Sequence, residues 1–122
     1  MEGGKTLTEK EKDKKIRKEF NKYKKKFGNL EKDKKEFVED LCQQAAFMKM
    51  TLLELQEDIN VKGAVVTATN GNGFEVTSEN PSQKSYNTMI KNYNATLKTL
   101  VELLPELEED DEMMNFIKGK GK

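Results

Sequence analysis

The side chains that most often carry out catalytic chemistry are scarce in this sequence. Its 122 residues contain no histidine and a single cysteine, Cys42, so the commonest general base and a multi-thiolate zinc site are both missing. Gly4-Lys5-Thr6 has residue types that end a phosphate-binding loop, but no strand-forming run precedes it. The acidic run from Glu108 to Glu112 is more typical of a solvated tail than of a magnesium site. The sequence therefore predicts a non-enzyme without metal or cofactor.

The chemistry that the sequence does offer is electrostatic. Residues 1–35 contain 14 Lys/Arg and 7 Asp/Glu, a balance of +7, and residues 36–122 reverse it to −7, although the net charge is zero. Such asymmetry is typical of a chain with a basic region that binds nucleic acid. Charge alone fits a solvated helix face equally well. The candidate DNA-binding residues are Lys14, Lys15, Arg17, Lys18, Lys22, Lys24, Lys25 and Lys26.

A helix is expected to position these cations. Thr8 with Glu11 fits a capping box, and Thr6 with Glu9 is a second possible register. The apolar residues that follow recur at steps of four, three and four, and are Ile16, Phe20, Tyr23 and Phe27. The glycine directly after them can adopt the left-handed conformation that ends a helix. Residues 1–29 are therefore predicted to form a basic N-terminal helix.

A second apolar pattern predicts a long helix from about Leu30 to Asn60. Its stripe keeps steps of three and four, and consists of Val38, Leu41, Ala45, Met48, Leu52, Leu55 and Ile59. Four further apolar residues widen the stripe: Phe37, Cys42, Phe47 and Leu53. Such a helix would be ~45 Å long, and its wide stripe indicates more than one neighbour. The candidate oligomerisation residues are Phe37, Leu41, Met48, Leu52 and Leu55, together with Phe74 and Val76 from the next segment.

That next segment has the pattern of a β-hairpin. Two alternating runs, residues 65–69 and 74–77, flank the turn sequence Asn70-Gly71-Asn72-Gly73. The loop can use the first Asn-Gly pair, the second pair or all four residues. All three registers place the same residues on one face, namely Val65, Thr67, Phe74 and Val76. Because an isolated hairpin is marginally stable, this face is expected to pack on the helices or on a neighbouring subunit.

A third helix is expected to follow, begun by Asn80 as N-cap and Pro81 as first residue, and ended by Pro105. Its predicted stripe is Tyr86, Met89 or Ile90, Tyr93, Leu97, Leu100, Val101 and Leu104. Residues 30–105 thus form the predicted oligomerisation core. Residues 106–122 are expected to be a flexible acidic tail with a short apolar partner-binding segment, which consists of Met113, Met114, Phe116 and Ile117.

Composition bounds the fold class. Only 34% of the residues are hydrophobic and the mean hydropathy is −0.87, which favours one mainly α domain of amphipathic helices that assembles into an oligomer over a monomer with a thick core. No apolar run approaches the roughly 20 residues of a membrane span, so no membrane contact is expected. With one cysteine and no recognisable signal peptide, an intracellular location is expected.

The order of elements in residues 36–105 carries a resemblance. A helix that ends in glycine precedes a hairpin with an Asn-Gly turn, and a Pro-led helix then ends near a Leu-x-x-Leu sequence. In this order and spacing the segment resembles the small terminase subunits of tailed bacteriophages. The lysine-rich N-terminal region matches no family pattern, so no DNA-contact residues follow from the resemblance. The matching positions are Gly63, Val65, Asn70, Gly71, Val76, Asn80, Pro81, Asn87, Leu97, Leu100, Leu103 and Leu104.

The resemblance implies a non-catalytic DNA-packaging protein in the cytoplasm of the host bacterium. Members of the family assemble into rings, here expected to contain about eight to twelve copies, and recognise double-stranded viral DNA. They also recruit and regulate the large terminase subunit, which holds the ATPase and nuclease. The hairpin would then be a subunit contact or a ring-lining element. The alternative is a helical protein–protein adaptor or coiled-coil scaffold, whose lysines only keep it soluble.

Overall fold

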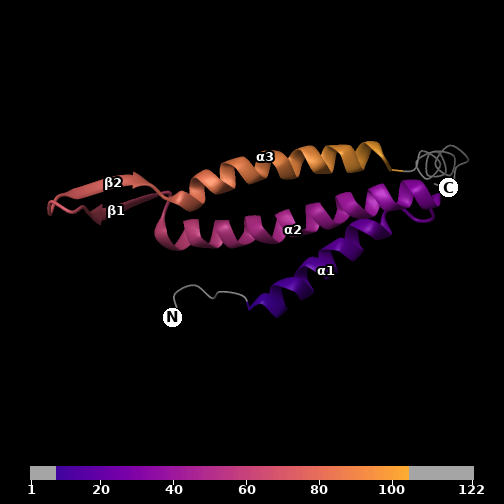
Figure 1. The fold of residues 1–122 in the computed structure, drawn as a ribbon, viewed down its shortest axis with the longest axis horizontal. Helices are drawn as coiled ribbons and strands as arrows, with labels where there is room; N and C mark the ends of the chain where they lie inside the picture. The colour runs from indigo at the N-terminus through magenta and orange to yellow at the C-terminus, as the bar shows by residue number, and fades with distance from the viewer. Residues whose placement is uncertain (1–7, 105–122) are drawn as a thin grey trace, which may run out of the picture.

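Three helices and one antiparallel hairpin make up the part of the chain that the structure describes. The computed structural model describes residues 8–104. Helices α2 and α3 run side by side in opposite directions, α1 crosses α2 obliquely, and the hairpin extends from the end where α2 meets α3 (Figure 1). The mainly helical fold with a central hairpin is therefore confirmed. The elements are α1 (Glu9–Lys25), α2 (Lys32–Lys62), β1 (Val65–Thr69), β2 (Glu75–Glu79) and α3 (Pro81–Glu102).

The start of α1 is set by a local capping interaction. The Glu11 backbone N–H donates to Thr8 Oγ1 at 3.0 Å, and the Thr8 backbone N–H donates to Glu11 Oε1 at 3.1 Å. This reciprocal pair satisfies two donors that the first turn of a helix leaves without a partner. Of the two predicted registers, the structure therefore has the one that begins at Thr8. At the other end, Gly28 takes a positive φ of 63° just after the helix, as predicted.

Helix α2 is the centre of the core because it is covered on two sides. One cluster joins all three helices and contains Phe27, Val38, Cys42, Ala45, Leu52, Tyr93 and Leu100. A second cluster lies between α1 and α2 and contains Ile16, Ala46 and Met50. Consecutive helix residues point about 100° apart, so Ala45 and Ala46 serve different clusters. The predicted stripe did not include Ala46 or Met50, which are buried, and it included Phe37, Phe47 and Leu53, which are exposed.

The Tyr23 hydroxyl and the Cys42 thiol, which both lie between the helices, stay protonated and neutral. The Tyr23 and Tyr93 hydroxyl oxygens lie 2.6 Å apart, which links α1 to α3. Burial, with this hydrogen bond, raises the pKa of Tyr23 well above its ordinary value. Burial likewise raises the pKa of the Cys42 thiol to about 11. The thiol is therefore a packing group, because only a thiolate is an effective nucleophile or metal ligand.

The hairpin register differs from all three predicted registers. Ala68 pairs with Val76 and Thr69 with Glu75, so the loop contains three residues, Gly71 to Gly73. The Asn70 side chain selects this loop, because its Oδ1 accepts the backbone N–H groups of Asn72 at 2.9 Å and Phe74 at 3.0 Å. The Asn70 carbonyl oxygen also accepts the Gly73 N–H at 3.0 Å. Gly73 then adopts a φ of 86°, as in a tight turn followed by a glycine bulge.

This register changes which residues share a face. An odd-length loop shifts the pairing by one residue relative to the predicted loops, and such a shift moves side chains to the opposite face. Phe74 and Val76 therefore lie on the face of Ala68, opposite Val65 and Thr67. The prediction of a face shared by Val65, Thr67, Phe74 and Val76 was wrong. Of the two contacts expected for the hairpin, packing on the helices of its own chain does not occur, because both strands are almost entirely exposed; packing on a neighbouring subunit stays a prediction.

Helix α3 begins as predicted and ends earlier. Asn80 Oδ1 accepts the Ser82 backbone N–H at 2.9 Å, and Pro81 is the first helical residue. The helix ends at Glu102, before the predicted stop at Pro105, which lies outside the described residues. Val101 is exposed, so the α3 stripe is narrower than predicted.

None of the three described helices is long and apolar enough to cross a membrane.

Candidate nucleic-acid interface

Helix α1 separates a core face from a cationic face. Its core face includes the buried residues Ile16 and Glu19. All eight cations predicted to bind DNA are exposed, because the apolar stripe takes the other side of the helix. Among them, Lys14, Lys18, Lys22 and Lys25 recur at steps of four, four and three, which places them on one stripe opposite the core.

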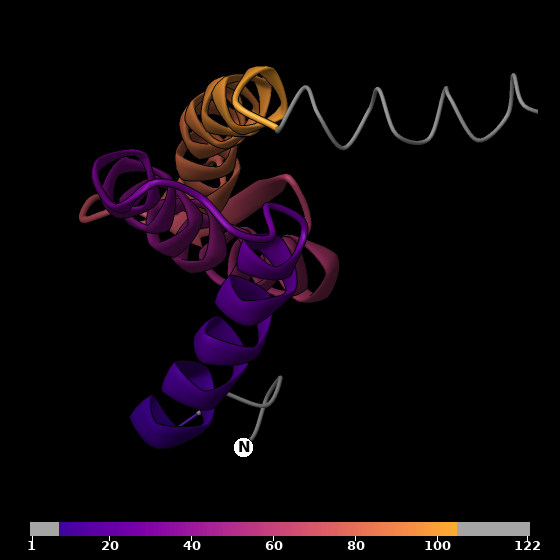
Figure 2. The same ribbon diagram turned by 90° about the vertical axis from the view of Figure 1, so that its right-hand side faces the viewer.

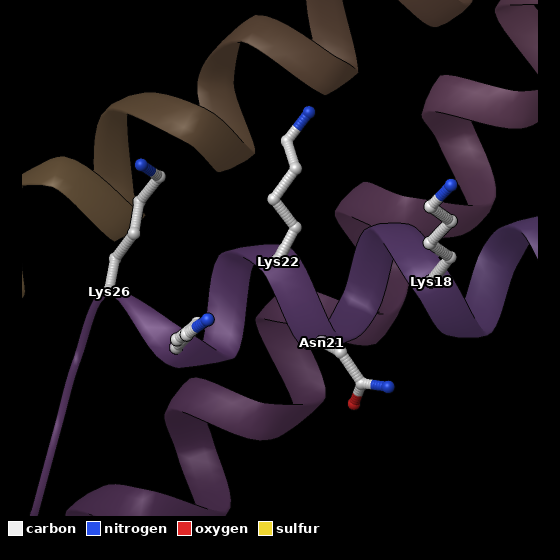
Figure 3. A pocket seen from close by; sticks show the side chains of 5 residues that line it. Lys18, Asn21, Lys22 and Lys26 are labelled. Carbon is white, nitrogen blue, oxygen red and sulfur yellow. The ribbon is translucent and has the colours of Figure 1, made fainter.

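The centre of this stripe forms a shallow open depression. It is lined by Lys18, Asn21, Lys22, Lys25 and Lys26, all from α1 and its C-terminal cap. Lys22 and Lys26 extend to one side of the helix and Asn21 to the other (Figure 3). A surface on one convex helix, with charges spaced ~6 Å apart along the axis every four residues, can meet a row of phosphates rather than enclose a small molecule. We call these five residues the basic face. Asn21 was missed in the sequence, although its steps of three and four from Lys18 and Lys25 place it on this stripe.

Ion pairs distinguish the lysines of α1 from one another. Lys24 Nζ lies 3.3 Å from a carboxylate oxygen of Glu39 on α2, and Lys22 Nζ lies 3.6 Å from Glu19. Lys24 also lies 5.7 Å from the centre of the Phe20 ring. Of the predicted DNA-binding residues, Lys24 is thus directed toward α2 rather than outward. The other six predicted cations form no ion pair with any carboxylate in residues 8–104, and are Lys14, Lys15, Arg17, Lys18, Lys25 and Lys26.

One further lysine of α1 has a structural role. Lys12 Nζ lies 2.8 Å from Glu54 Oε1 and 3.3 Å from Thr51 Oγ1, both on α2. It also lies 5.1 Å from the centre of the Phe47 ring. Together with the Lys24–Glu39 pair, this contact fastens α1 to α2 near both of its ends. The basic face therefore sits on a helix that is held in place independently of those lysines.

The predicted oligomerisation residues do not form one surface. Leu52 is 5% exposed and belongs to the core of its own chain, and Leu41 and Met48 pack against the same cluster. Leu55 is half-buried. Three of the seven remain as large exposed apolar groups, namely Phe37, Phe74 and Val76. Phe37 lies near the start of α2, at the opposite end of the molecule from the hairpin that carries the other two (Figure 1).

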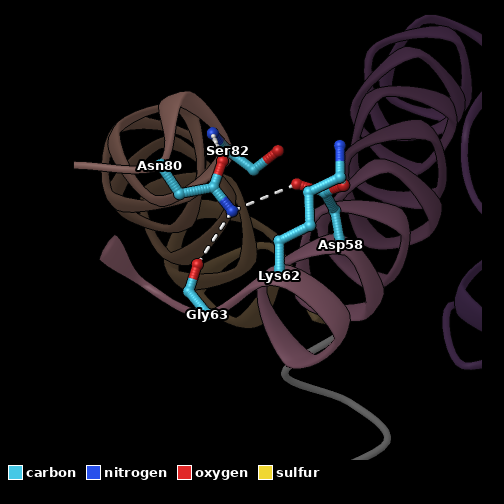
Figure 4. A network of polar contacts seen from close by, with 5 residues as sticks. All are labelled: Asp58, Lys62, Gly63, Asn80 and Ser82. Atoms are coloured by element: carbon cyan, nitrogen blue, oxygen red, sulfur yellow. Dashed lines mark hydrogen bonds and ion pairs between the residues drawn. The ribbon is translucent and has the colours of Figure 1, made fainter. Parts of the chain in front are cut away.

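The hairpin is tied to the helices by a buried asparagine. Asn80 is 2% exposed. Its Nδ2 donates to the Gly63 carbonyl oxygen at 2.9 Å and to Asp58 Oδ2 at 3.2 Å (Figure 4). Its backbone N–H donates to the Ala64 carbonyl oxygen at 2.8 Å. Lys62 completes the group with an ion pair of 3.1 Å to Asp58. The two ends of the hairpin and the adjoining ends of α2 and α3 therefore meet at one residue, Asn80.

Hydrogen bonding keeps the carboxylate of this group charged. The pKa of Asp58 is lowered from its ordinary value, chiefly because the Ser82 hydroxyl donates to it, and further because Lys62 and Asn80 do so. Asp58 is accordingly a constant acceptor at neutral pH rather than a proton-transfer group. We interpret the group as a structural clamp that orients the hairpin.

No group of three or more Cys, Asp or Glu side chains within residues 8–104 is arranged to hold a metal ion. The acidic run from Glu108 to Glu112 lies outside the described residues. So do the predicted partner-binding residues, Met113, Met114, Phe116 and Ile117.

No family model, curated protein or solved structure matches this chain. The case for a function therefore depends on the basic face, the exposed hairpin and the order of the elements.

Proposed function

We propose that this chain is a non-catalytic DNA-packaging protein of the small-terminase type. In this proposal the basic face binds double-stranded viral DNA and the hairpin contributes to a ring of about eight to twelve copies. The ring then recruits the large terminase subunit, which supplies the ATPase and nuclease. The proposal rests on the resemblance of residues 36–105 to that family together with the geometry of α1.

The observation that carries the DNA-binding part is the position of the lysines relative to the core. The side chains of Lys18, Lys22 and Lys25 are exposed, while the apolar residues of α1 face α2. The described core contains none of these lysines, so their concentration on one stripe has no explanation in packing. Lysine rows of this kind bind DNA by neutralising phosphates and releasing counterions, without reading the base sequence.

DNA binding through the basic face predicts a strong dependence on salt. Each phosphate contact adds roughly 0.9 to the slope of log affinity against log salt. Replacement of Lys18, Lys22 and Lys25 by Gln is therefore expected to lower that slope by up to about 2.7 and to weaken binding of all DNA sequences alike. Fluorescence anisotropy of a labelled duplex at several salt concentrations measures both quantities.

The matched control removes the same number of charges from another exposed helix face. Lys84, Lys91 and Lys98 are exposed on α3, and their replacement by Gln changes the net charge equally. The control is expected to alter the slope much less than the α1 variant. Equal slopes for the unchanged chain and the α1 variant would show that the basic face is only a solvated surface.

The exposed hairpin supports the assembly part of the proposal. Phe74 is 69% exposed and Val76 is 44% exposed, on the same face of the hairpin. A monomer rarely leaves a projecting hairpin with such residues uncovered, since an isolated hairpin is marginally stable in water. A neighbouring copy that covers this face would supply the missing burial.

Assembly through this face predicts that substitution of Phe74 and Val76 by Ser lowers the native mass, because the apolar area available to a neighbour decreases. Light scattering or native mass spectrometry measures the change. Thr67 and Thr77 lie on the opposite face and their hydroxyl oxygens are 3.3 Å apart. Their replacement by Ser keeps both hydroxyls and is expected to leave the mass unchanged.

The mass of the unchanged chain also separates the two function classes. A large ring supports the terminase proposal. A monomer or dimer supports the helical adaptor or scaffold. The ion pairs of Lys22 and Lys24 also favour that alternative, because both lysines already have carboxylate partners in the chain.

A further inference from the structure

The described part of the chain stops, after α3, at the end of the molecule where the basic face ends. Leu103 packs on the same hydrophobic cluster that contains Phe27, and Phe27 directly follows Lys26 of the basic face. Viewed from that end, the last turn of α3 and the connection between α1 and α2 both lie toward the viewer (Figure 2). Leu104, the last described residue, therefore lies close to the C-terminal end of α1, and the acidic segment follows it in the sequence.

The segment and the basic face have complementary charge. Six of the seven residues 106–112 carry a carboxylate: Glu106, Glu108, Glu109, Asp110, Asp111 and Glu112. The basic face offers four lysines, of which Lys18, Lys25 and Lys26 form no ion pair with a carboxylate of residues 8–104. A dense row of carboxylates offers these lysines the same kind of acceptor as a row of phosphates.

The chain is long enough for the two to meet. Eight residues, 105–112, span at most roughly 26–29 Å when fully extended. The part of α1 from Lys18 to Lys26 is only about 12 Å long. An extended acidic segment that starts beside the end of α1 can therefore run along the whole basic face.

We propose that residues 106–112 bind the basic face of their own chain and compete there with DNA. This inference rests on the proposed function, because it assigns a regulator to the same surface. A short tether gives the segment an effective concentration in the millimolar range, so even a weak contact occupies the face in the absence of DNA. DNA of sufficient charge density displaces the segment, which then becomes available to other partners.

The competition predicts that neutralising the segment strengthens DNA binding. Replacement of Glu108 and Glu109 by Gln and Asp110 by Asn in the full chain is expected to increase the affinity for a random-sequence duplex about three- to tenfold at low salt. The difference should shrink at high salt, since screening weakens the segment's contact. Anisotropy titration of a labelled duplex measures both effects.

A matched variant separates competition from a change in net charge. Glu57, Glu75 and Glu79 are exposed and lie on the last part of α2 and on the hairpin. Their replacement by Gln removes the same number of negative charges far from the basic face. If this control strengthens DNA binding as much as the tail variant does, net charge accounts for the effect and the proposal is overturned.

A second experiment tests the contact without DNA. A labelled peptide of residues 105–122 is added to the full chain in which Glu108, Glu109 and Asp110 are neutralised. The peptide is expected to bind at low salt and to shift the backbone amide resonances of residues 18–26. Binding should be lost when Lys18, Lys22 and Lys25 are replaced by Gln, and retained when Lys84, Lys91 and Lys98 are replaced.

The outcomes distinguish the two proposals. Absence of peptide binding, or shifts confined to the hairpin or to the start of α2, overturns the inference, whatever the DNA experiments show. If the peptide binds the basic face but no variant binds DNA, the contact stands and DNA binding as the proposed function fails. Peptide binding together with displacement by duplex DNA supports both.

Discussion

Replacement of Leu52 by Asp is expected to unfold the chain, whereas the same replacement at the next residue is not. Leu52 is 5% exposed and lies in the cluster that joins all three helices. Truncation of a buried leucine to alanine alone costs about 2–5 kcal/mol, and an unpaired charge there adds several kcal/mol more. The sum is comparable to the whole stability of a small domain, about 5–15 kcal/mol.

Leu53 provides the control because it is 45% exposed on the same helix. Asp at this position has nearly the same helix propensity cost but leaves the core intact. Urea unfolding followed by circular dichroism compares the two variants. A folded Leu52→Asp protein, with a midpoint close to that of Leu53→Asp, would contradict the placement of Leu52 in the core of the single chain.

The second large effect is expected at Asn80, where Ala should lower the free energy of unfolding by about 2–4 kcal/mol. The substitution removes the acceptor for the Ser82 N–H and the donor to Gly63 and Asp58. Both losses occur at a side chain that is 2% exposed, so water cannot readily replace the missing partners. Hydrogen exchange of the hairpin amides should also accelerate, because its base is no longer clamped.

Two further substitutions separate the capping role of Asn80 from its role in the clamp and provide a control. Asp keeps an oxygen acceptor for the Ser82 N–H but removes the donor and places a second carboxylate beside Asp58, so it tests the clamp separately from the cap. Asn87 is an exposed asparagine of the same helix, whose Oδ1 accepts from Gln83 Nε2 at 2.9 Å, and its replacement by Ala should cost less than about 0.5 kcal/mol. A loss at Asn80 no greater than that at Asn87 would show that the network contributes little.

These two positions support different parts of the proposed function. The core around Leu52 holds the three helices together and so presents the basic face of α1. The Asn80 clamp sets the direction in which the hairpin projects. A variant that weakens the clamp without unfolding the helices should therefore impair assembly more than DNA binding by a single chain.

Local interactions could be read from the sequence because both partners lie within one turn of each other. The capping box of Thr8 and Glu11 and the N-cap of Asn80 depend on groups two or three residues apart. The apolar periodicity likewise located Val38, Ala45 and Leu100 in the core, since a helix presents residues three and four apart on one face. The existence and order of the elements follow from these short-range rules.

Tertiary structure decided what depends on distant neighbours. The periodicity of α2 alone could not tell that Leu52 is covered and Phe37 exposed, because burial depends on where α1 and α3 cross it. The ion pair of Lys24 with Glu39, which turns one predicted DNA-binding lysine toward α2, depends on the same crossing. Both outcomes come from packing between helices rather than from the residue types.

The hairpin register was only partly predictable from the sequence, because it depends both on local turn residues and on pairing between the strands. The turn residues Asn70 to Gly73 were recognised, but several loop lengths have similar local cost, and a difference of one residue exchanges the faces of a strand. The Asn70 side chain, which accepts two backbone N–H groups across the loop, favours the three-residue form. The sequence by itself determined that a hairpin joins two helices, and only the closed loop determined which side chains it presents to a neighbour, because a face is set by pairing across the loop.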